Sequence, residues 1–237
     1  SGMSVGEIKG NMIKARDLYS PVSDNIKIKD ATSRDMSWVE SMCKSVNPDV
    51  VVIDMGDKFA RTAGYARPDE ALKANANGMV TTALRPHLIW GPGDHHLTPR
   101  ILSRAKMGKL KLVGDGSNKV DSTYIDNAAH AHLLAADLIY KMGHQAPCAG
   151  KAYFISNDEP LTMRDLINRI LKAGGQSPVT KTVSPTLAYI VGAIMEKWYL
   201  SRHIQTEPIM TRFVARQLST DHWFDITAAK NNINIAF

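Results

Sequence analysis

The sequence predicts an α/β fold with a parallel, doubly wound sheet, and three observations support this class. Pro48–Asp54 (PDVVVID) is a continuous β-branched run, typical of a strand buried on both faces. Asp35–Val46, just before it, carries apolar residues at the 3.6-residue period of an amphipathic helix. Met79–Leu84 (MVTTAL) is a second apolar run that leads into Pro86, His87 and the turn Gly91–Asp94. Such a loop beyond the carboxyl end of a strand is where α/β sheets bind ligands.

The elements at the amino-terminal end fit the same sheet. Met12–Asp17 and Asn25–Asp30 read as two short strands, each ending in an acid. Together with the helix and strand over 35–54 they give the order strand, strand, helix, strand, which is typical of a parallel sheet. Asp69–Ala76 follows as a helix with Pro68 at or near its first turn.

The carboxyl-terminal half alternates helices and strands. Thr162 is the predicted N-cap of a helix within 159–175, because Asp165 stands at the third helical position as in a capping box. Gly174 and Gly175 end that helix. A last short helix begins after Asp225 or Thr227. The other expected elements are helices over Leu97–Met107 and Asp126–Lys141 and strands over Lys109–Val113 and Ala152–Ser156.

The composition is that of a globular protein. The 237 residues are 44% hydrophobic and 22% charged, with a net charge of +6. The basic residues are scattered and no zinc motif or basic-aromatic patch accompanies them, which argues against nucleic-acid binding. An anionic cofactor or an anionic membrane surface would match the excess charge. Cys43 and Cys148 lack metal-ligand spacing, so we expect buried thiols, no bound metal and, without a secretory signal pattern, a cytoplasmic protein.

The segment Pro185–Leu200 (PTLAYIVGAIMEKWYL) has two interpretations. It is shorter than the roughly 18 apolar residues that span a bilayer. One interpretation is a core helix or a lid over the substrate. The other is a helix that lies on a membrane, with Trp198 and Tyr199 at the headgroup level and Lys197 and Arg202 near lipid phosphates, which would give peripheral membrane association.

Four sequence blocks stand out between Tyr65 and Ile235. They are, in chain order, ALRPHLIWGPGD, LVGDGSNKVDSTYIDNAAHAHLLA, GKAYFISNDEPLTMRDLI and HWFDITAAKNNI. In composition and order these blocks resemble the 3β-hydroxysteroid dehydrogenase branch of the extended short-chain dehydrogenase/reductase superfamily. The resemblance implies a Rossmann-like sheet, an NAD(P) cofactor and, often in this family, a homodimer.

The resemblance also implies residues that bind the cofactor. It places Pro86 and His87 against the nicotinamide ribose and carboxamide. If Met12–Asp17 is the second strand of a Rossmann unit, Asp17 binds the adenosine ribose hydroxyls and Asp30 lies near the adenine. An acid at Asp17 repels a 2′-phosphate, so NAD is preferred, while the neighbouring Arg16 leaves NADP open.

The chain departs from the family pattern at three places. No GxGxxG or GxxGxxG precedes Asp17, and the stretch after Pro48–Asp54 is too short for the strand that supplies the catalytic serine. Tyr65 matches the family's catalytic tyrosine, but Asp69 stands where the lysine of YxxxK belongs. A carboxylate there would raise the phenol pKa rather than lower it. Either the chain is a degenerate relative, or stretches of a longer natural chain are missing, which we favour.

We therefore expect residues 3–93 to form an incomplete Rossmann-like domain. Residues 94–237 would form mainly a smaller substrate-binding part that returns in places to the sheet. The predicted function is NAD(P)-dependent oxidoreduction of a secondary alcohol or ketone on a hydrophobic 3β-hydroxysteroid or long-chain β-hydroxy or β-keto acid, with Tyr65 as acid/base. Two alternatives are a sugar-nucleotide epimerase or dehydratase, and a reductase-like protein without activity.

Overall fold

The computed structural model describes residues 51–54, 72, 75, 79–94, 97–204 and 208–237. The strands and helix expected between residues 12 and 46 lie outside these residues, as does most of the helix expected over 69–76. The chain forms two compact units. Unit 1 takes the described residues up to Leu97 together with 122–159 and 224–237, and unit 2 takes 98–121 and 160–223. The predicted functional division at residue 93 stays a prediction.

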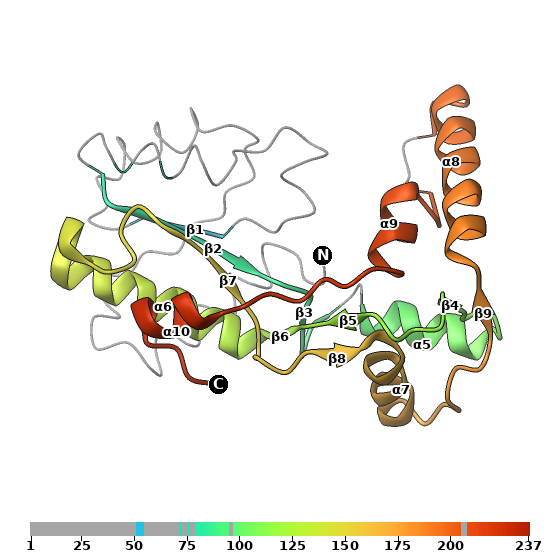
Figure 1. Ribbon diagram of the computed structural model, residues 1–237, viewed down its shortest axis with the longest axis horizontal. Coiled ribbons are helices and arrows are strands. Elements are labelled where there is room, and N and C mark those ends of the chain that lie inside the picture. Colours follow the sequence, from blue (N-terminus) through green and yellow to red (C-terminus); the bar gives the residue numbers. More distant parts are fainter. Residues whose placement is uncertain (1–50, 55–71, 73–74, 76–78, 95–96, 205–207) are drawn as a thin grey trace. The chain divides into compact units, whose positions relative to one another are not determined.

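Unit 1 contains a parallel three-stranded sheet in the order β1-β2-β7. The strands are β1 (Val51–Asp54), β2 (Thr81–Pro86) and β7 (Ala152–Ile155), which lie side by side in Figure 1. Both neighbours of β2 run parallel to it. The α/β class with parallel strands is therefore confirmed for the described residues. β2 begins two residues later than predicted, because its ladder with β1 starts at Thr81.

Two helices bury the apolar side of this sheet. They are α6 (Ile125–Met142), predicted within one residue at each end, and α10 (Thr227–Ile233), whose N-cap is Ile226 rather than the predicted Asp225 or Thr227. Cys148 is buried in the same core, as expected, and burial raises the pKa of its thiol, which keeps it protonated and unreactive. The fully or nearly fully buried core residues include Leu84, Ala131, Ala135, Ile139, Tyr153, Ile155, Ile226, Ala229, Ile233 and Ile235.

A second, very short parallel pair completes unit 1. It joins β3 (Ile89–Trp90) to β6 (Thr123–Tyr124), which leads directly into α6. A short 3-10 helix, η2 (Gly143–Gln145), follows α6. Since β3 starts only three residues after β2 ends, the chain changes sheets over His87 and Leu88.

Unit 2 is mainly helical. Its helices are α5 (Thr98–Lys106), α7 (Met163–Ala173), α8 (Pro185–Ser201) and α9 (Arg212–Gln217). Two-residue strand pairs link them: β4 (Leu112–Val113) runs parallel to β9 (Thr182–Val183), and β5 (Lys119–Val120) runs antiparallel to β8 (Leu161–Thr162). The longer strand predicted over 109–113 is limited to its last two apolar residues.

The start of α7 confirms the predicted cap. The Thr162 hydroxyl oxygen accepts a hydrogen bond from the Asp165 amide at 3.0 Å, and the hydroxyl donates to the Asp165 carboxylate at 2.7 Å. This satisfies one of the amide groups that a helix leaves without an internal partner at its first turn. Asp225 likewise accepts from the Thr227 amide at the start of α10, at 2.8 Å.

No helix within the described part of the chain has the length and apolar character needed to cross a membrane.

Candidate active site

The candidate site lies at the carboxyl end of β2, in the segment that follows the strand. Pro86 is the last residue of β2, is buried, and stands in register with Ile155 of β7. The next residue, His87, is 8% exposed, and its backbone amide donates to the Ile155 carbonyl at 3.0 Å. The carboxyl ends of the parallel strands β2 and β7 therefore sit at one edge, where open α/β sheets bind ligands.

The chain turns sharply just beyond this edge. Leu88 has φ of 41°, in the left-handed region that costs a branched L-residue roughly 1–2 kcal/mol. Gly91, with φ of 143°, passes so close to α6 that an added Cβ would lie 2.6 Å from Cγ2 of Ile125. A larger residue would have to displace the Ile125 side chain, and the positive φ also favours glycine. The turn that begins at Leu88 and reaches Gly93 is thus fixed against the amino-terminal end of α6.

Thr123 of β6 forms hydrogen bonds with the carboxyl ends of both β2 and β7. Its side chain is fully buried, and its hydroxyl lies 2.9 Å from both the His87 and the Ile155 carbonyl oxygens, so one proton is shared between two acceptors. The Thr123 amide donates to the Leu88 carbonyl at 3.3 Å. One residue thereby holds the end of β2, the end of β7 and the start of α6 in register.

Asn157, in the loop after β7, holds that loop to the segment that leads into α6. Its side-chain oxygen accepts from the Tyr124 amide and from the Asn127 side-chain amide, both at 3.0 Å. The Asn157 amide in turn donates to the Ser122 carbonyl at 2.9 Å. These bonds satisfy the first backbone donor of α6 without a capping side chain on Tyr124 itself.

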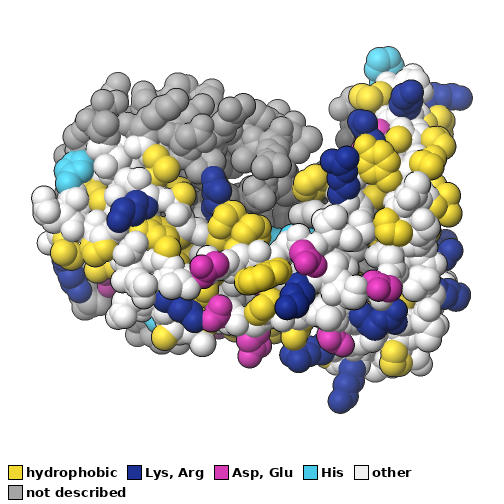
Figure 2. All heavy atoms as spheres, in the orientation of Figure 1, with side chains coloured by type: hydrophobic (Ala, Val, Ile, Leu, Met, Phe, Trp, Pro, Cys, Tyr) yellow, Lys and Arg dark blue, Asp and Glu magenta, His cyan; other side chains and the backbone are white. Residues whose placement is uncertain are grey.

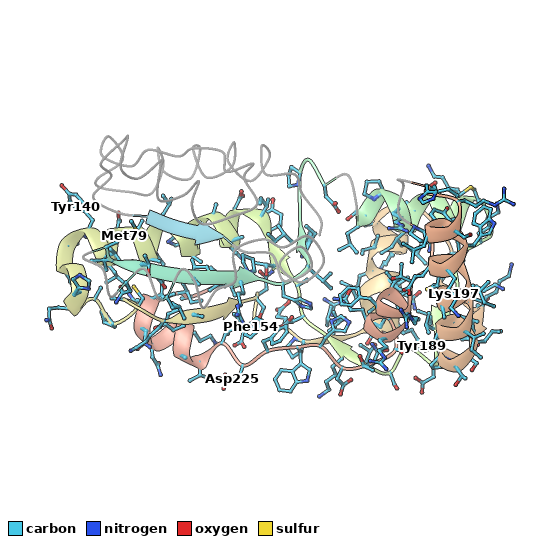
Figure 3. The ribbon with its side chains drawn as sticks, turned by 90° about the horizontal axis from the view of Figure 1, so that it is seen from above. Met79, Tyr140, Phe154, Tyr189, Lys197 and Asp225 are labelled. Atoms are coloured by element: carbon cyan, nitrogen blue, oxygen red, sulfur yellow. The ribbon has the colours of Figure 1, made fainter. Side chains whose placement is uncertain are left out.

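A column of stacked side chains runs from the sheet to His87. The guanidinium of Arg85 lies 5.3 Å from the centre of the Phe154 ring, and Phe154 stacks face to face on Phe224 with ring centres 3.7 Å apart. The imidazole of His87 meets Phe224 edge-on at 5.1 Å. Phe154 is labelled on β7 in Figure 3. The arrangement fixes the imidazole through apolar and aromatic contacts.

These contacts define what His87 offers to a ligand. Its peptide N–H and C=O both form hydrogen bonds within the protein. A nicotinamide carboxamide is neutral and needs a donor and an acceptor. The ring nitrogens of the His87 imidazole can donate or accept a hydrogen bond, so the chemistry of this side chain suits a carboxamide. The residues present therefore fit the nicotinamide end of NAD(P) in their chemistry.

The turn carries one buried acid. Asp94 is 8% exposed, and its carboxylate accepts from the Leu97 amide at 3.0 Å, while its own amide donates to the Gly91 carbonyl at 3.1 Å. These bonds assign Asp94 to closure of the turn. Among the described residues, no group of three or more His, Cys, Asp and Glu side chains is placed to hold a metal ion.

The structure brings together only part of the predicted site. Pro86 and His87 lie side by side at the expected edge of the sheet. Tyr65, Asp17 and Asp30 lie outside the described residues, so their roles stay predictions. Sequence reasoning missed Thr123 and Phe224 as residues that position His87. Both lie in blocks that carry the family resemblance, but no pattern within a block shows which side chain turns toward the loop.

Comparison with known proteins finds similar sequences. The chain is 58% identical over 155 residues to a 2-alkyl-3-oxoalkanoate reductase of Shewanella oneidensis, covering 65% of this chain and 39% of that protein. It is 50% identical over 179 residues to a protein of the same name from Stenotrophomonas maltophilia, covering 76% and 53%. The chain thus spans about two fifths of the first relative and about half of the second.

A solved structure shows the same fold at low identity. It is a nucleoside-diphosphate-sugar epimerase of Pseudomonas aeruginosa, with a TM-score of 0.57 and 15% identity, covering 83% of this chain and 64% of that one. At the level of sequence, residues 25–185 match the 3-beta hydroxysteroid dehydrogenase/isomerase family. With the parallel sheet and the loop after β2 in the expected place, the chain belongs to the 3-beta hydroxysteroid dehydrogenase/isomerase family.

Proposed function

We propose that the protein is an NAD(P)-dependent oxidoreductase that interconverts the 3-keto and 3-hydroxy groups of 2-alkyl-3-oxoalkanoates. The observation that carries this proposal is the identity of 58% and 50% to two 2-alkyl-3-oxoalkanoate reductases. These matches extend over most of the chain, and the substrate named is a β-keto acid of the class that the sequence predicts. A 3β-hydroxysteroid is the second substrate class to test.

The cofactor proposal rests on the family and on the loop after β2. Members of this family use NAD(P), which supplies or removes the hydride when bound. Pro86 and His87 would hold the nicotinamide end. Thr123 and Phe224 position that loop through the bonds and ring contacts described above. Asp17 would bind the adenosine ribose and Asp30 would lie near the adenine, which favours NAD over NADP.

The proton at the substrate oxygen is assigned to Tyr65. A phenol can donate it during ketone reduction and remove it during alcohol oxidation. Asp69 in place of the family's lysine would raise the pKa of the phenol, which weakens it as a proton donor in ketone reduction and depletes the phenolate that alcohol oxidation needs. We therefore expect slow turnover in both directions at neutral pH if this pairing is present in the whole protein.

The two units would have different roles in binding. Unit 1, with the parallel sheet, would be a doubly wound cofactor-binding domain, and unit 2 would contribute the smaller substrate-binding part. A cytoplasmic homodimer is the state we expect for the whole protein. The boundary near residue 93 would then mark the point where cofactor contacts give way to substrate contacts.

The test is a reductase assay on the purified protein. NADH and NADPH oxidation is followed at 340 nm with 2-alkyl-3-oxoalkanoates of increasing alkyl length, with a 3-ketosteroid for comparison. Calorimetry measures binding of each cofactor separately. We expect turnover of the oxoalkanoates that is lost in Tyr65→Phe while cofactor binding is kept. Cofactor binding with no turnover of any ketone would instead support a reductase-like protein without activity.

A sugar-nucleotide epimerase remains the alternative enzyme. The fold that it shares with the epimerase at 15% identity carries no information about substrate. Binding of a UDP-sugar in the same calorimeter, together with failure of every β-keto acid, would replace the reductase proposal with this one.

A further inference from the structure

Helices α8 and α9 of unit 2 are held together by a close backbone approach and an ion pair. Gly192 of α8 lies so close to the backbone of Thr211 that an added Cβ would be 2.5 Å from its carbonyl carbon. Glu196 of α8 accepts from the Arg212 amide at 2.7 Å and from the Arg212 guanidinium at 2.6 Å. These contacts fix the spacing of the two helices, so a cavity between them has rigid walls.

A pocket of about 280 Å³ opens between the two helices, wholly within unit 2. We call it the α8–α9 pocket. Its lining comes from the first two turns of α8, the end of α9 and the residues just after α9: Pro185, Thr186, Tyr189, Ala215, Arg216 and Ser219. Tyr189 is labelled on α8 in Figure 3. Since a water molecule takes up about 30 Å³ of the liquid, the pocket has room for a small anionic group and a short alkyl segment.

The lining combines apolar surface with one charge. Ala215 is buried in the small core of unit 2, and Tyr189 packs against that core. The Ser219 hydroxyl donates to the Ala215 carbonyl at 2.8 Å, so its proton is used within the protein. Among the described residues that line the pocket, Arg216 carries the only charge.

The guanidinium of Arg216 is oriented by a ring contact. It lies over the ring of Tyr189, 5.2 Å from the ring centre. Within the described part of the chain, no carboxylate lies within ion-pair distance of Arg216, whereas Arg212, one turn earlier on α9, is paired with Glu196. A ring provides no oxygen acceptor, so the N–H donors of Arg216 can serve a ligand.

The charge of unit 2 favours an anionic ligand. Unit 2 carries 14 Lys and Arg against 6 Asp and Glu, a net charge of +8. Figure 2 shows Lys and Arg side chains on the visible face over α8 and α9. The field of the unit raises the local concentration of an anion, and Arg216 offers it a specific contact.

We propose that the α8–α9 pocket binds the carboxylate of an alkyl carboxylate, with Arg216 as the residue that recognises the charge. A guanidinium fits a carboxylate through two parallel N–H···O bonds. The Thr186 hydroxyl can donate a further bond, and Ala215 and the Tyr189 ring would contact the adjoining alkyl carbons. The identification of this group as the C1 carboxylate of a 2-alkyl-3-oxoalkanoate rests on the proposed function.

Charge and lining favour a carboxylate over a diphosphate. A nucleoside diphosphate carries more than one negative charge, and the described lining offers one cation. A single arginine neutralises a single carboxylate. The apolar part of the lining also favours carbon atoms directly beside the anionic group, which an alkyl carboxylate has and a diphosphate lacks.

Calorimetry on the purified protein tests the pocket, with octanoate as the probe and no cofactor present. Octanamide is its neutral analogue with the same alkyl chain. We expect octanoate to bind the wild-type protein about tenfold more tightly than octanamide, because hydrogen bonds between charged partners are the stronger ones. Arg216→Gln should remove this preference. Arg216→Lys should keep part of it, since lysine retains the charge but not the planar fork.

Arg169→Gln is the matched control. Arg169 is an exposed arginine of α7, in the same unit but outside the pocket, so its loss lowers the net charge of unit 2 by the same amount. Octanoate binding should be unchanged in this variant. Equal losses of octanoate affinity in Arg169→Gln and Arg216→Gln would overturn the proposal, because net charge would then explain the binding. Melting temperatures verify that every variant is folded.

Steady-state kinetics test the link to the substrate. Arg216→Gln should raise KM for a 2-alkyl-3-oxoalkanoate about tenfold, with kcat and NAD(H) affinity kept, as expected when a contact equal in ground state and transition state is lost. KM for the corresponding ketone without the carboxylate should not change. Octanoate binding that needs Arg216, together with an unchanged KM, would support the pocket but overturn its assignment to the substrate.

Two further results would overturn the proposal itself. One is octanoate binding no tighter than octanamide binding in the wild-type protein. The other is binding of inorganic pyrophosphate, in place of octanoate, that is lost in Arg216→Gln. Because calorimetry with octanoate needs neither cofactor nor turnover, failure of the reductase proposal would leave this test intact.

Discussion

Replacing Thr123 with valine should loosen the loop after β2 by removing one hydroxyl from the interior. The valine side chain has nearly the same shape, so packing around it is kept. The hydroxyl serves the carbonyls of His87 and Ile155. The Ile155 carbonyl still accepts from the His87 amide in the variant. The main loss is therefore the hydrogen bond to the His87 carbonyl.

The magnitude follows from that single loss. A buried acceptor deprived of its hydrogen bond costs about 1–3 kcal/mol, and we expect about 1–2 kcal/mol for Thr123→Val because one of the two carbonyls stays bonded. For a domain of this size the corresponding fall in melting temperature is about 4 °C. The affinity for NAD(H) should fall as well, because the same bond fixes the position of His87.

Thr82→Val is the matched control for this experiment. Thr82 is also fully buried, and its hydroxyl donates to the Lys151 carbonyl at 3.0 Å, at the other end of β2. That carbonyl also accepts from the Ala83 amide. Urea unfolding and NAD(H) calorimetry on both variants provide the comparison. If Thr123→Val is no more destabilising than Thr82→Val and binds NAD(H) as the wild type does, our reasoning about the hydroxyl is wrong.

Three other predictions concern single residues in the rest of the molecule. Thr162→Ala should destabilise unit 2 by about 1 kcal/mol through loss of the N-cap of α7, measured by thermal unfolding, whereas Thr162→Ser should be close to neutral. Gly192→Ala should cost about 1–3 kcal/mol, because the new methyl group overlaps the backbone of Thr211, and a stable variant would contradict the close helix contact. Burial raises the pKa of Tyr153, whose hydroxyl donates to the Pro147 carbonyl and accepts from the Asn232 amide. Since the folded pKa is above the unfolded value of about 10, the contribution of Tyr153 to stability is fully present below pH 10 and is lost as the pH rises through the folded pKa. Tyr153→Phe should abolish this part of the alkaline loss in a urea titration series, and an unchanged pH profile would sink the assignment.

The elements that were predicted well from the sequence are marked by residues within the element or directly beside it. The helix after Thr162 has a cap, a polar first turn and a glycine stop, and these act over a few residues. The strand at 51–54 was recognisable because a continuous β-branched run can be identified without knowledge of the strands that it pairs with. The segment from Pro185 was recognisable as apolar and helical, but its outward face follows from where α9 packs, which no periodicity reveals.

The elements that were missed depend on distant residues. The pairs β3–β6 and β5–β8 each contain two residues per strand, too few for an alternating pattern. The positioning residues of the candidate site have the same origin. Thr123 and Phe224 reach His87 from 36 and 137 positions farther along the chain, so their roles exist only once the fold has formed.

The position of α10 in the sequence affects the order in which the two units can fold during synthesis. Ile226, Ala229, Ile233 and Ile235 belong to the same core as Leu84 of β2, yet all of unit 2 between 160 and 223 is synthesised before they appear. Unit 2 is complete at Trp223, so it can fold while unit 1 still exposes the apolar face that α10 will cover. Nascent chains stalled before residues 224–235 have left the ribosome should therefore expose that face to chaperones, and emergence of these residues should be the event that closes it.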